Sequence, residues 1–113
     1  GHLDLVVSNR NSNNVSVLLN TGTGTGTFAA AVNYATDATP QSPVLGDVNG
    51  DGLLDIITAN GGTMSISILL NTGGGIFAAP VNYAATNPTV VFPCDLDGDG
   101  DIDLAASTLG GNS

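Results

Sequence analysis

"LDLVVSNRNSNNVSVLLNTG" (3–22) is matched by the similar stretch "LDIITANGGTMSISILLNTG" (54–73), and this duplication decides the fold. A second stretch, "FAAAVNYAT" (28–36), returns in the same order as "FAAPVNYAA" (77–85). A third, "SPVLGDVNGDGLLDIITAN" (42–60), returns as "TVVFPCDLDGDGDIDLAAST" (89–108). The chain is therefore a repeat protein whose unit is about four dozen residues long.

The pattern within a unit predicts β-strands. The segments are short and rich in β-branched residues, and Gly, Asn and Pro separate them, whereas no segment has a convincing helical period. Apolar residues alternate from Phe28 to Tyr34 and from Phe77 to Tyr83, so these strands should have one apolar face. The nearly continuous apolar run 54–59 is typical of a strand that is covered on both faces. The expected strands are 44–46 and 90–94, then 3–8, 54–59 and 102–107, then 15–19 and 65–70, then 28–34 and 77–83.

Four antiparallel strands in a unit of this length are typical of a β-propeller blade. A sandwich of the same strands is the alternative, but a sandwich does not require the sequence to repeat, so the repetition favours the propeller. A blade cannot bury both of its faces alone, and blades therefore stack around an axis. We expect an all-β chain forming a single repeat region over residues 1–113, with about two blades plus partial units: a partial blade at 1–36, a complete blade at 41–85 and a partial blade at 88–113.

Two acidic loops connect the first and second strands of these units. "DVNGDGLLD" (47–55) and "DLDGDGDID" (95–103) place oxygen-bearing side chains at the first, third, fifth and ninth positions. Such a set suits Ca²⁺, which takes six to eight oxygen ligands, and the residue at the seventh position would contribute its backbone carbonyl. A Gly at the sixth position allows the positive φ that folds the loop around the ion. The predicted ligands are Asp47, Asn49, Asp51, Leu53 and Asp55 in one loop, and Asp95, Asp97, Asp99, Asp101 and Asp103 in the other.

Other readings of these loops fit less well. An EF-hand loop requires a Glu at position twelve and a helix on each side, but Thr58 and Ala106 stand at that position and the flanks look like strands. Mg²⁺ prefers fewer carboxylates and keeps its water ligands. A merely solvated Asp-rich turn does not explain why two copies share the same ligand positions and the same Gly.

Composition narrows the function further. The formal net charge is −9, with ten acidic residues, one strong cation (Arg10) and one His. This balance argues for bound cations and against nucleic acid, which requires a basic face. No apolar run approaches the length of about 18 residues that spans a bilayer, so membrane insertion is not expected. Cys94 is the only Cys and is expected to be buried. Catalysis is not expected, because the carboxylates are explained as metal ligands.

"GDVNGDGLLDIITAN" and "CDLDGDGDIDLAAST", with their "LLNTG" segments, resemble FG-GAP or VCBS repeats, the calcium-binding blades of α-integrin heads and of many bacterial secreted proteins. The resemblance implies that the two loops bind Ca²⁺, and that the protein is secreted or displayed at a cell surface. Asp4 matches the ninth position of a third loop, with Gly1 at the sixth. Complete propellers of this kind usually have about seven blades.

Two function classes remain open. One is an extracellular binding or adhesion module that contacts a protein or glycan. The other is a structural repeat unit that forms a ring or filament by head-to-tail pairing of blades. Tyr34 and Tyr83 are expected in the blade core and not on a glycan-stacking surface, because of their period-two neighbours. Both ends of the chain stop inside a unit, so we expect further repeats in the same chain or a homo-oligomer.

Overall fold

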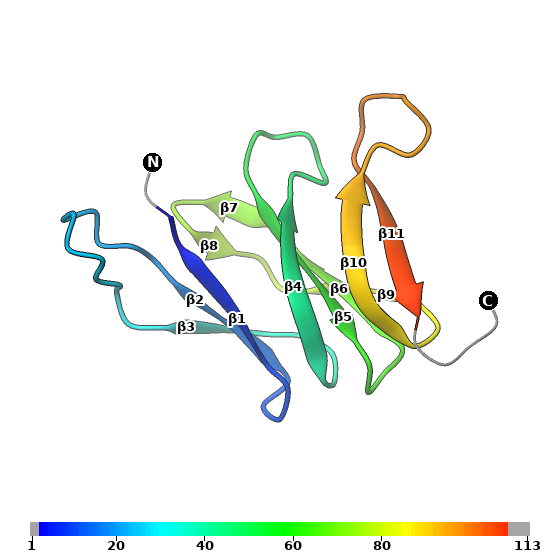
Figure 1. Ribbon diagram of the computed structural model, residues 1–113, viewed down its shortest axis with the longest axis horizontal. Coiled ribbons are helices and arrows are strands. Elements are labelled where there is room, and N and C mark those ends of the chain that lie inside the picture. The colour runs from blue at the N-terminus through cyan, green and yellow to red at the C-terminus, as the bar shows by residue number, and fades with distance from the viewer. Residues whose placement is uncertain (1–2, 109–113) are drawn as a thin grey trace.

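The computed structural model describes residues 3–108, which form strands and turns only. Three sheets stand side by side as successive blades (Figure 1). The first blade contains β1 (Leu5–Asn9), β2 (Asn14–Leu18) and β3 (Val32–Ala35). The second contains β4 (Pro40–Gly46), β5 (Asp55–Asn60), β6 (Ser65–Leu69) and β9 (Val81–Ala84), with a small hairpin of β7 (Asn71–Gly73) and β8 (Ile76–Phe77). The third contains β10 (Pro88–Cys94) and β11 (Asp103–Thr108).

The prediction of an all-β chain built from propeller-blade fragments is confirmed. Every pair of neighbouring strands in the three blades is antiparallel, and the second blade has four strands in the order β4-β5-β6-β9. The first two blades also share their register, because Val6 lies opposite Val17 and Ile57 lies opposite Ile68. Among the described residues there is no helix long and apolar enough to cross a membrane.

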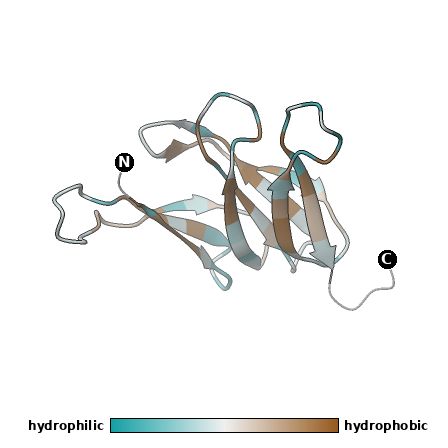
Figure 2. Ribbon diagram, turned by 45° about the horizontal axis from the view of Figure 1, so that its top comes forward, coloured by the Kyte–Doolittle hydropathy of each residue, from teal (hydrophilic) through white to brown (hydrophobic). Residues whose placement is uncertain are grey.

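Two apolar clusters hold the blades together, and most of the hydrophobic colour lies on the strands and not on the upper loops (Figure 2). We call the contact between the first and second blades the first interface, and that between the second and third blades the second interface. The strand β5 lies in both and is buried at every residue, as predicted for a strand covered on both faces. The first interface contains Val15, Val17, Ile56 and Leu69, with Val6, Leu19, Tyr34 and Phe77 packed around them. The second contains Ile57, Ala59, Ile66 and Val91, with Val44, Ile68 and Leu104.

The predicted starts are wrong for two kinds of strand, the outer strands and the inner strands of the blades. The outer strands begin at Val32 and Val81, not at Phe28 and Phe77. The preceding residues extend a hairpin instead, because the N–H of Ala29 donates to the carbonyl of Leu19 at 2.8 Å, and the same bond joins Ala78 to Leu70 in the second unit. The inner strands start earlier than predicted, at residues 40 and 88. Both starts are Pro, which the first position of a strand tolerates because it needs no N–H donor there.

Two predicted core residues, Tyr83 and Cys94, are more exposed than expected. Tyr34, by contrast, packs in the first interface as predicted, where its ring meets Phe77 edge to face at a centroid distance of 5.5 Å. Its counterpart Tyr83 is 55% exposed, because the third blade packs mainly against β4 and β5 and leaves β9 uncovered. The expectation of a buried Cys94 is also wrong, since the side chain is half-buried at the end of β10.

Candidate metal centre

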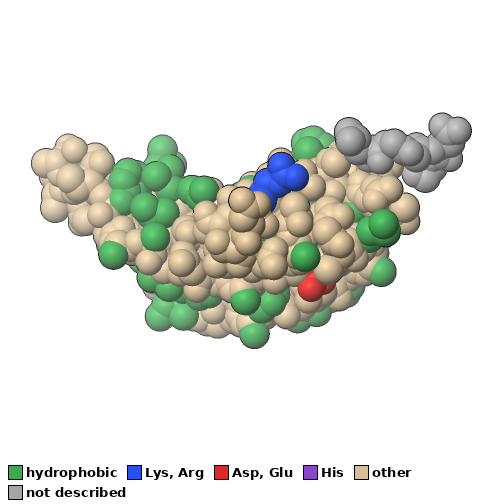
Figure 3. Space-filling model, turned by 90° about the horizontal axis from the view of Figure 1, so that it is seen from below, with side chains coloured by type: hydrophobic (Ala, Val, Ile, Leu, Met, Phe, Trp, Pro, Cys, Tyr) green, Lys and Arg blue, Asp and Glu red, His purple; other side chains and the backbone are tan. Residues whose placement is uncertain are grey.

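Both acidic loops lie at the same end of the molecule, above β4–β5 and β10–β11 in Figure 1. Figure 2 shows them as hydrophilic caps on strands that are largely hydrophobic. The only Lys or Arg of the chain, Arg10, follows β1 and is visible in the view from below (Figure 3). The acidic end therefore has no Lys or Arg to balance its charge.

In the first loop, backbone N–H groups converge on the carboxylate of Asp47. Gly50 and Asp51 donate to its Oδ1 at 2.8 and 3.1 Å, and Gly52 donates to its Oδ2 at 2.8 Å. Further along the loop, the N–H of Leu53 donates to Asp51 Oδ1 at 2.9 Å. These bonds wrap the backbone around the first-position residue and hold the loop closed.

The second loop repeats this arrangement around Asp95. Gly98 donates to its Oδ1 at 2.7 Å and Gly100 to its Oδ2 at 2.9 Å, while the N–H of Asp101 donates to Asp99 Oδ1 at 2.9 Å. The N–H of Gly100, followed by that of Gly98, lowers the pKa of the Asp95 carboxyl, although partial desolvation opposes this shift. The Asp95 carboxylate is therefore charged at neutral pH and ready to accept a cation.

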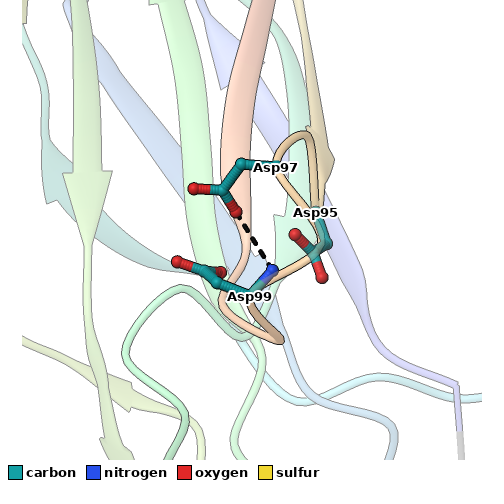
Figure 4. A group of neighbouring side chains, drawn as sticks. All are labelled: Asp95, Asp97 and Asp99. Carbon is teal, nitrogen blue, oxygen red and sulfur yellow. Dashed lines mark hydrogen bonds between the residues drawn. The ribbon is translucent and has the colours of Figure 1, made fainter.

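Three carboxylates of the second loop gather on one side. Asp95, Asp97 and Asp99 are all exposed, and each offers an oxygen atom such that these atoms lie within 4.8 Å of one another (Figure 4). Ca²⁺ binds oxygen at about 2.3 to 2.6 Å, so two of its ligands lie at most about 5 Å apart. The group therefore fits a single Ca²⁺ ion, and carboxylate oxygens are its preferred donors.

The first loop has an amide where the second has its middle carboxylate. Asn49 donates through Nδ2 to Asp51 Oδ2 at 3.0 Å, and its Oδ1 accepts the N–H of Asp51 at 3.2 Å. The amide oxygen remains a hard ligand of the kind that Ca²⁺ accepts. The side chains of Leu53 and Asp101 are not in the carboxylate group. Their predicted contribution is a backbone carbonyl, and it stays a prediction.

The ninth-position residues have structural partners that were not predicted. Asp55 is fully buried, and its Oδ2 accepts the N–H of Val48 at 3.0 Å while its Oδ1 accepts the N–H of Asn71 at 2.8 Å. The carboxylate thus ties the acidic loop to the β7–β8 hairpin of the same blade. Asp103 likewise accepts the N–H of Leu96 at 2.9 Å. Whether Asp55 and Asp103 also bind the metal stays a prediction.

Asp4 occupies the corresponding place in the first blade. Its Oδ1 accepts the N–H of Asn20 at 2.8 Å, just as Asp55 accepts that of Asn71. The repeated "LLNTG" was the sequence signal for this bond, since Asn20 and Asn71 stand at the same position in it. Gly1, the other residue of the predicted third loop, lies outside the described residues.

The fourth-position glycines were missing from the predicted loops. A positive φ was predicted only at the sixth position, where Gly52 and Gly100 have φ values of 85° and 93°. Gly50 and Gly98 also have positive φ, at 76° and 79°. Residues with a Cβ rarely adopt this conformation, so both glycines are needed for the loop to close. Their presence at the same place in both loops was the available signal.

The model of the FG-GAP-like repeat family matches the chain twice, over residues 1–58 and over residues 47–106. Each match includes at least one acidic loop and the beginning of the strand that follows it. No match was found among curated proteins or among solved structures.

Proposed function

The chain belongs to the FG-GAP-like repeat family, and on that premise we propose that it is a calcium-binding β-propeller segment that binds protein or glycan ligands at a cell surface or outside the cell. The observation that carries the proposal is the group of three exposed carboxylates, Asp95, Asp97 and Asp99, whose oxygens lie close enough to share one ion. We assign the segment no catalytic role.

Each loop would hold one ion. Asp95, Asp97 and Asp99 supply side-chain oxygens in the second loop, and Asp47, Asn49 and Asp51 supply them in the first. Leu53 and Asp101 add backbone carbonyls, while Asp55 and Asp103 complete the two sets. Bound Ca²⁺ supplies positive charge that offsets the mutual repulsion of the carboxylates. Two ions would change the formal charge from −9 to −5.

A pocket at the same end favours a protein ligand over a glycan. It opens between the first and second blades beside Gly52 and Leu53 of the first acidic loop, and its volume is about 500 Å³. About half of its lining residues are apolar and the polar side chains are Asp4, Asn20 and Asn71, so the pocket suits the apolar side chain of a protein ligand better than a hydroxyl-rich sugar, whose polar groups cost free energy when they are buried without partners. The apolar lining residues are Val6, Val17, Leu19, Leu45, Leu53, Leu54 and Phe77.

Calcium removal tests the metal part of the proposal. We expect the melting temperature to rise in millimolar Ca²⁺ relative to excess EDTA, because the native loops bind the ion and the unfolded chain does not. Linkage predicts about 2.7 kcal/mol of stabilisation when free Ca²⁺ exceeds its dissociation constant about a hundredfold. Mg²⁺ at the same concentration is the control and should stabilise less. An unchanged midpoint in Ca²⁺ would refute the metal site.

A pair of variants tests the ligand register. Asp99→Ala should reduce the calcium affinity of its loop about tenfold or more, which is about 1.4 kcal/mol, because its carboxylate belongs to the group. Asp101→Ala is the matched control and should change the affinity much less, because only its backbone carbonyl is assigned to the ion. Calorimetric titration of both variants measures the difference, and equal losses would show that the register is wrong.

The ligand-binding part needs its own measurement. Glycan arrays and a panel of extracellular-matrix proteins, each probed in Ca²⁺ and in EDTA, would detect it directly. We expect binding to a protein that is weaker in EDTA. Calcium binding without any such partner would leave the metal site standing and would refute the adhesive role.

A further inference from the structure

We propose that Asn49 is a deamidation site, at which the side-chain amide is converted to a carboxylate when the first acidic loop loses its ion. Asn is a thermolabile residue, and a following Gly favours the reaction because the attacking backbone nitrogen then belongs to a residue without a side chain. The chain has two such bonds, Asn49–Gly50 and Asn60–Gly61. The dependence on the ion rests on the proposed metal site, whereas the contrast between the two bonds rests on the fold alone.

The reaction at Asn49 needs no reagent other than water. The backbone nitrogen of Gly50 gives its proton to hydroxide and attacks the side-chain Cγ of Asn49. A new bond forms between this nitrogen and Cγ, the bond from Cγ to Nδ2 breaks, and the departing nitrogen takes a proton from water to leave as ammonia. Water then opens the cyclic imide at either of its carbonyls, which gives aspartate or isoaspartate.

The fold leaves Asn49 accessible and holds it through residues of its own loop. Asn49 is exposed, and the loop projects beyond the ends of β4 and β5 (Figure 1). Its Nδ2 donates to Asp51 Oδ2 at 3.0 Å, and its Oδ1 accepts the N–H of Asp51 at 3.2 Å. The N–H of Gly50 donates to Asp47 Oδ1 at 2.8 Å. Water can replace such exposed hydrogen bonds, so the loop can open without separating the strands.

The residues that hold Asn49 in place are also predicted metal ligands. Asp47 and Asp51 carry like charges, and without a cation their repulsion favours an open loop. An ion that binds the closed loop and not the open one reduces the open population about a hundredfold when its free concentration is about a hundred times its dissociation constant. Calcium therefore protects Asn49, and loss of calcium exposes Asn49 to attack.

Asn60 has the same following residue and the opposite surroundings. It is the last residue of β5, it is fully buried, and it pairs with Ser65 of β6. Its Nδ2 donates to the Oγ atoms of Ser65 and Ser67 at 3.2 and 2.8 Å. The N–H of Gly61, which would have to attack, donates to the carbonyl of Thr39 at 3.1 Å. Attack at Asn60 requires the end of β5 to separate from β6, so Asn60 reports unfolding of the blade and not opening of the loop.

The two products have different consequences for the loop. Aspartate gives the first loop the acidic residue that the second loop already has at this position, Asp97, and one added carboxylate changes the formal charge from −9 to −10. Isoaspartate carries the backbone through the former side chain, which lengthens the path between Asp47 and Asp51 and changes the spacing of the predicted ligands. The first loop thus keeps a permanent chemical record of calcium loss.

Peptide mapping by mass spectrometry, after incubation of the full 113-residue chain at neutral pH, tests the inference. Parallel samples contain Ca²⁺, excess EDTA, or urea with EDTA. Chymotrypsin cleaves after Leu53 and Leu54, so the two asparagines fall in different peptides. We expect Asn49 to deamidate at least about tenfold faster in EDTA than in Ca²⁺ at about a hundred times its dissociation constant, while Asn60 stays intact in both. In urea the two should react at similar rates, because both precede Gly.

Calorimetric titration of the same preparation with Ca²⁺ separates failure of this inference from failure of the metal site. If Ca²⁺ binds but Asn49 deamidates equally fast in Ca²⁺ and in EDTA, the inference is wrong and the metal site stands. If Ca²⁺ does not bind, the metal site fails, and the dependence on the ion fails with it. Equal rates for Asn49 and Asn60 in EDTA also overturn the inference, because the blade and not the loop would then be opening.

The variant Asn49→Gln is the matched control for the site of reaction. It keeps a side-chain amide before Gly50 but adds a methylene group, so that the attack has to close a larger and less favourable ring. We expect the deamidation signal that the parent chain gives in EDTA to disappear in this variant. A signal of unchanged size would place the reaction at another residue and would overturn the inference.

Discussion

The strands β5 and β1 have closely related sequences and very different surroundings. "LDIITAN" and "LDLVVSN" occupy the same place in successive units, and both form strands with the same pairing to the next strand. Every residue of β5 is buried, whereas β1 is exposed or half-buried throughout. The local sequence therefore determines the strand, and the neighbouring blade determines its burial. The stability of this chain should accordingly be concentrated in the second blade.

The largest expected difference comes from truncating equivalent residues of these strands. Ile56→Ala should destabilise the fold by about 2 to 5 kcal/mol, because Ile56 is fully buried in the first interface. Leu5→Ala should cost less than about 1.5 kcal/mol, since nearly half of that side chain is already in contact with water. Urea denaturation of dilute protein in Ca²⁺ measures both. Similar losses would mean that the first blade is covered in solution or that the second is not.

A second difference should appear between the ninth-position carboxylates. Asp55→Ala removes the acceptor of the N–H groups of Val48 and Asn71, which are half-buried residues, and should cost about 1 to 3 kcal/mol in total. Asp103→Ala removes the acceptor of Leu96, whose N–H lies at an exposed residue that water can reach. The free energies of unfolding should be compared in EDTA, so that no metal contributes. Equal effects would show that the tie to Asn71 contributes little.

The smallest expected difference in stability is between variants of the two equivalent tyrosines, Tyr34 and Tyr83. Tyr34→Leu removes the edge-to-face contact with Phe77 and should cost about 0.5 to 1.5 kcal/mol beyond the lost area. Tyr83→Leu should stay within about 0.5 kcal/mol, because the ring is mostly exposed. Double-mutant cycles with Phe77→Leu should give a coupling energy for Tyr34 and none for Tyr83. A coupling energy for Tyr83 would place it in a contact that the structure does not contain.

The features predicted correctly from sequence are those that depend on nearby residues. Alternation and turn residues located the strands, and the spacing of Asp and Gly located both loops between the strands that they connect. The carboxylate group of Asp95, Asp97 and Asp99 lies within five consecutive residues, so its closeness follows from the loop itself. These inferences needed no knowledge of which blades are neighbours.

The wrong predictions depend on distant packing. Tyr83 has the same local pattern as Tyr34, but its exposure depends on how far the third blade extends over β9. The bond between Asp55 and Asn71 joins residues 16 positions apart, so its geometry requires the hairpin to be placed first. The late start of β3 and β9 follows from hairpin bonds made by Ala29 and Ala78, and alternation alone does not report them.

The linker between β3 and β4 contains one acidic residue, Asp37, which forms hydrogen bonds to β6 of the next blade. Similar repeats can exchange strands during folding, and "NNVSVLL" of one unit resembles "SISILL" of the next. Asp37 accepts a hydrogen bond from Ser65 Oγ at 2.8 Å, and its N–H donates to Ser67 Oγ at 3.2 Å. The residue equivalent to Ser65 in β2 is Asn14, which is larger than the serine at this buried position. Asp37 thus bonds to a serine that β2 lacks at the equivalent position, and in the folded chain this bond ties the linker that leaves the first blade to β6 of the second blade.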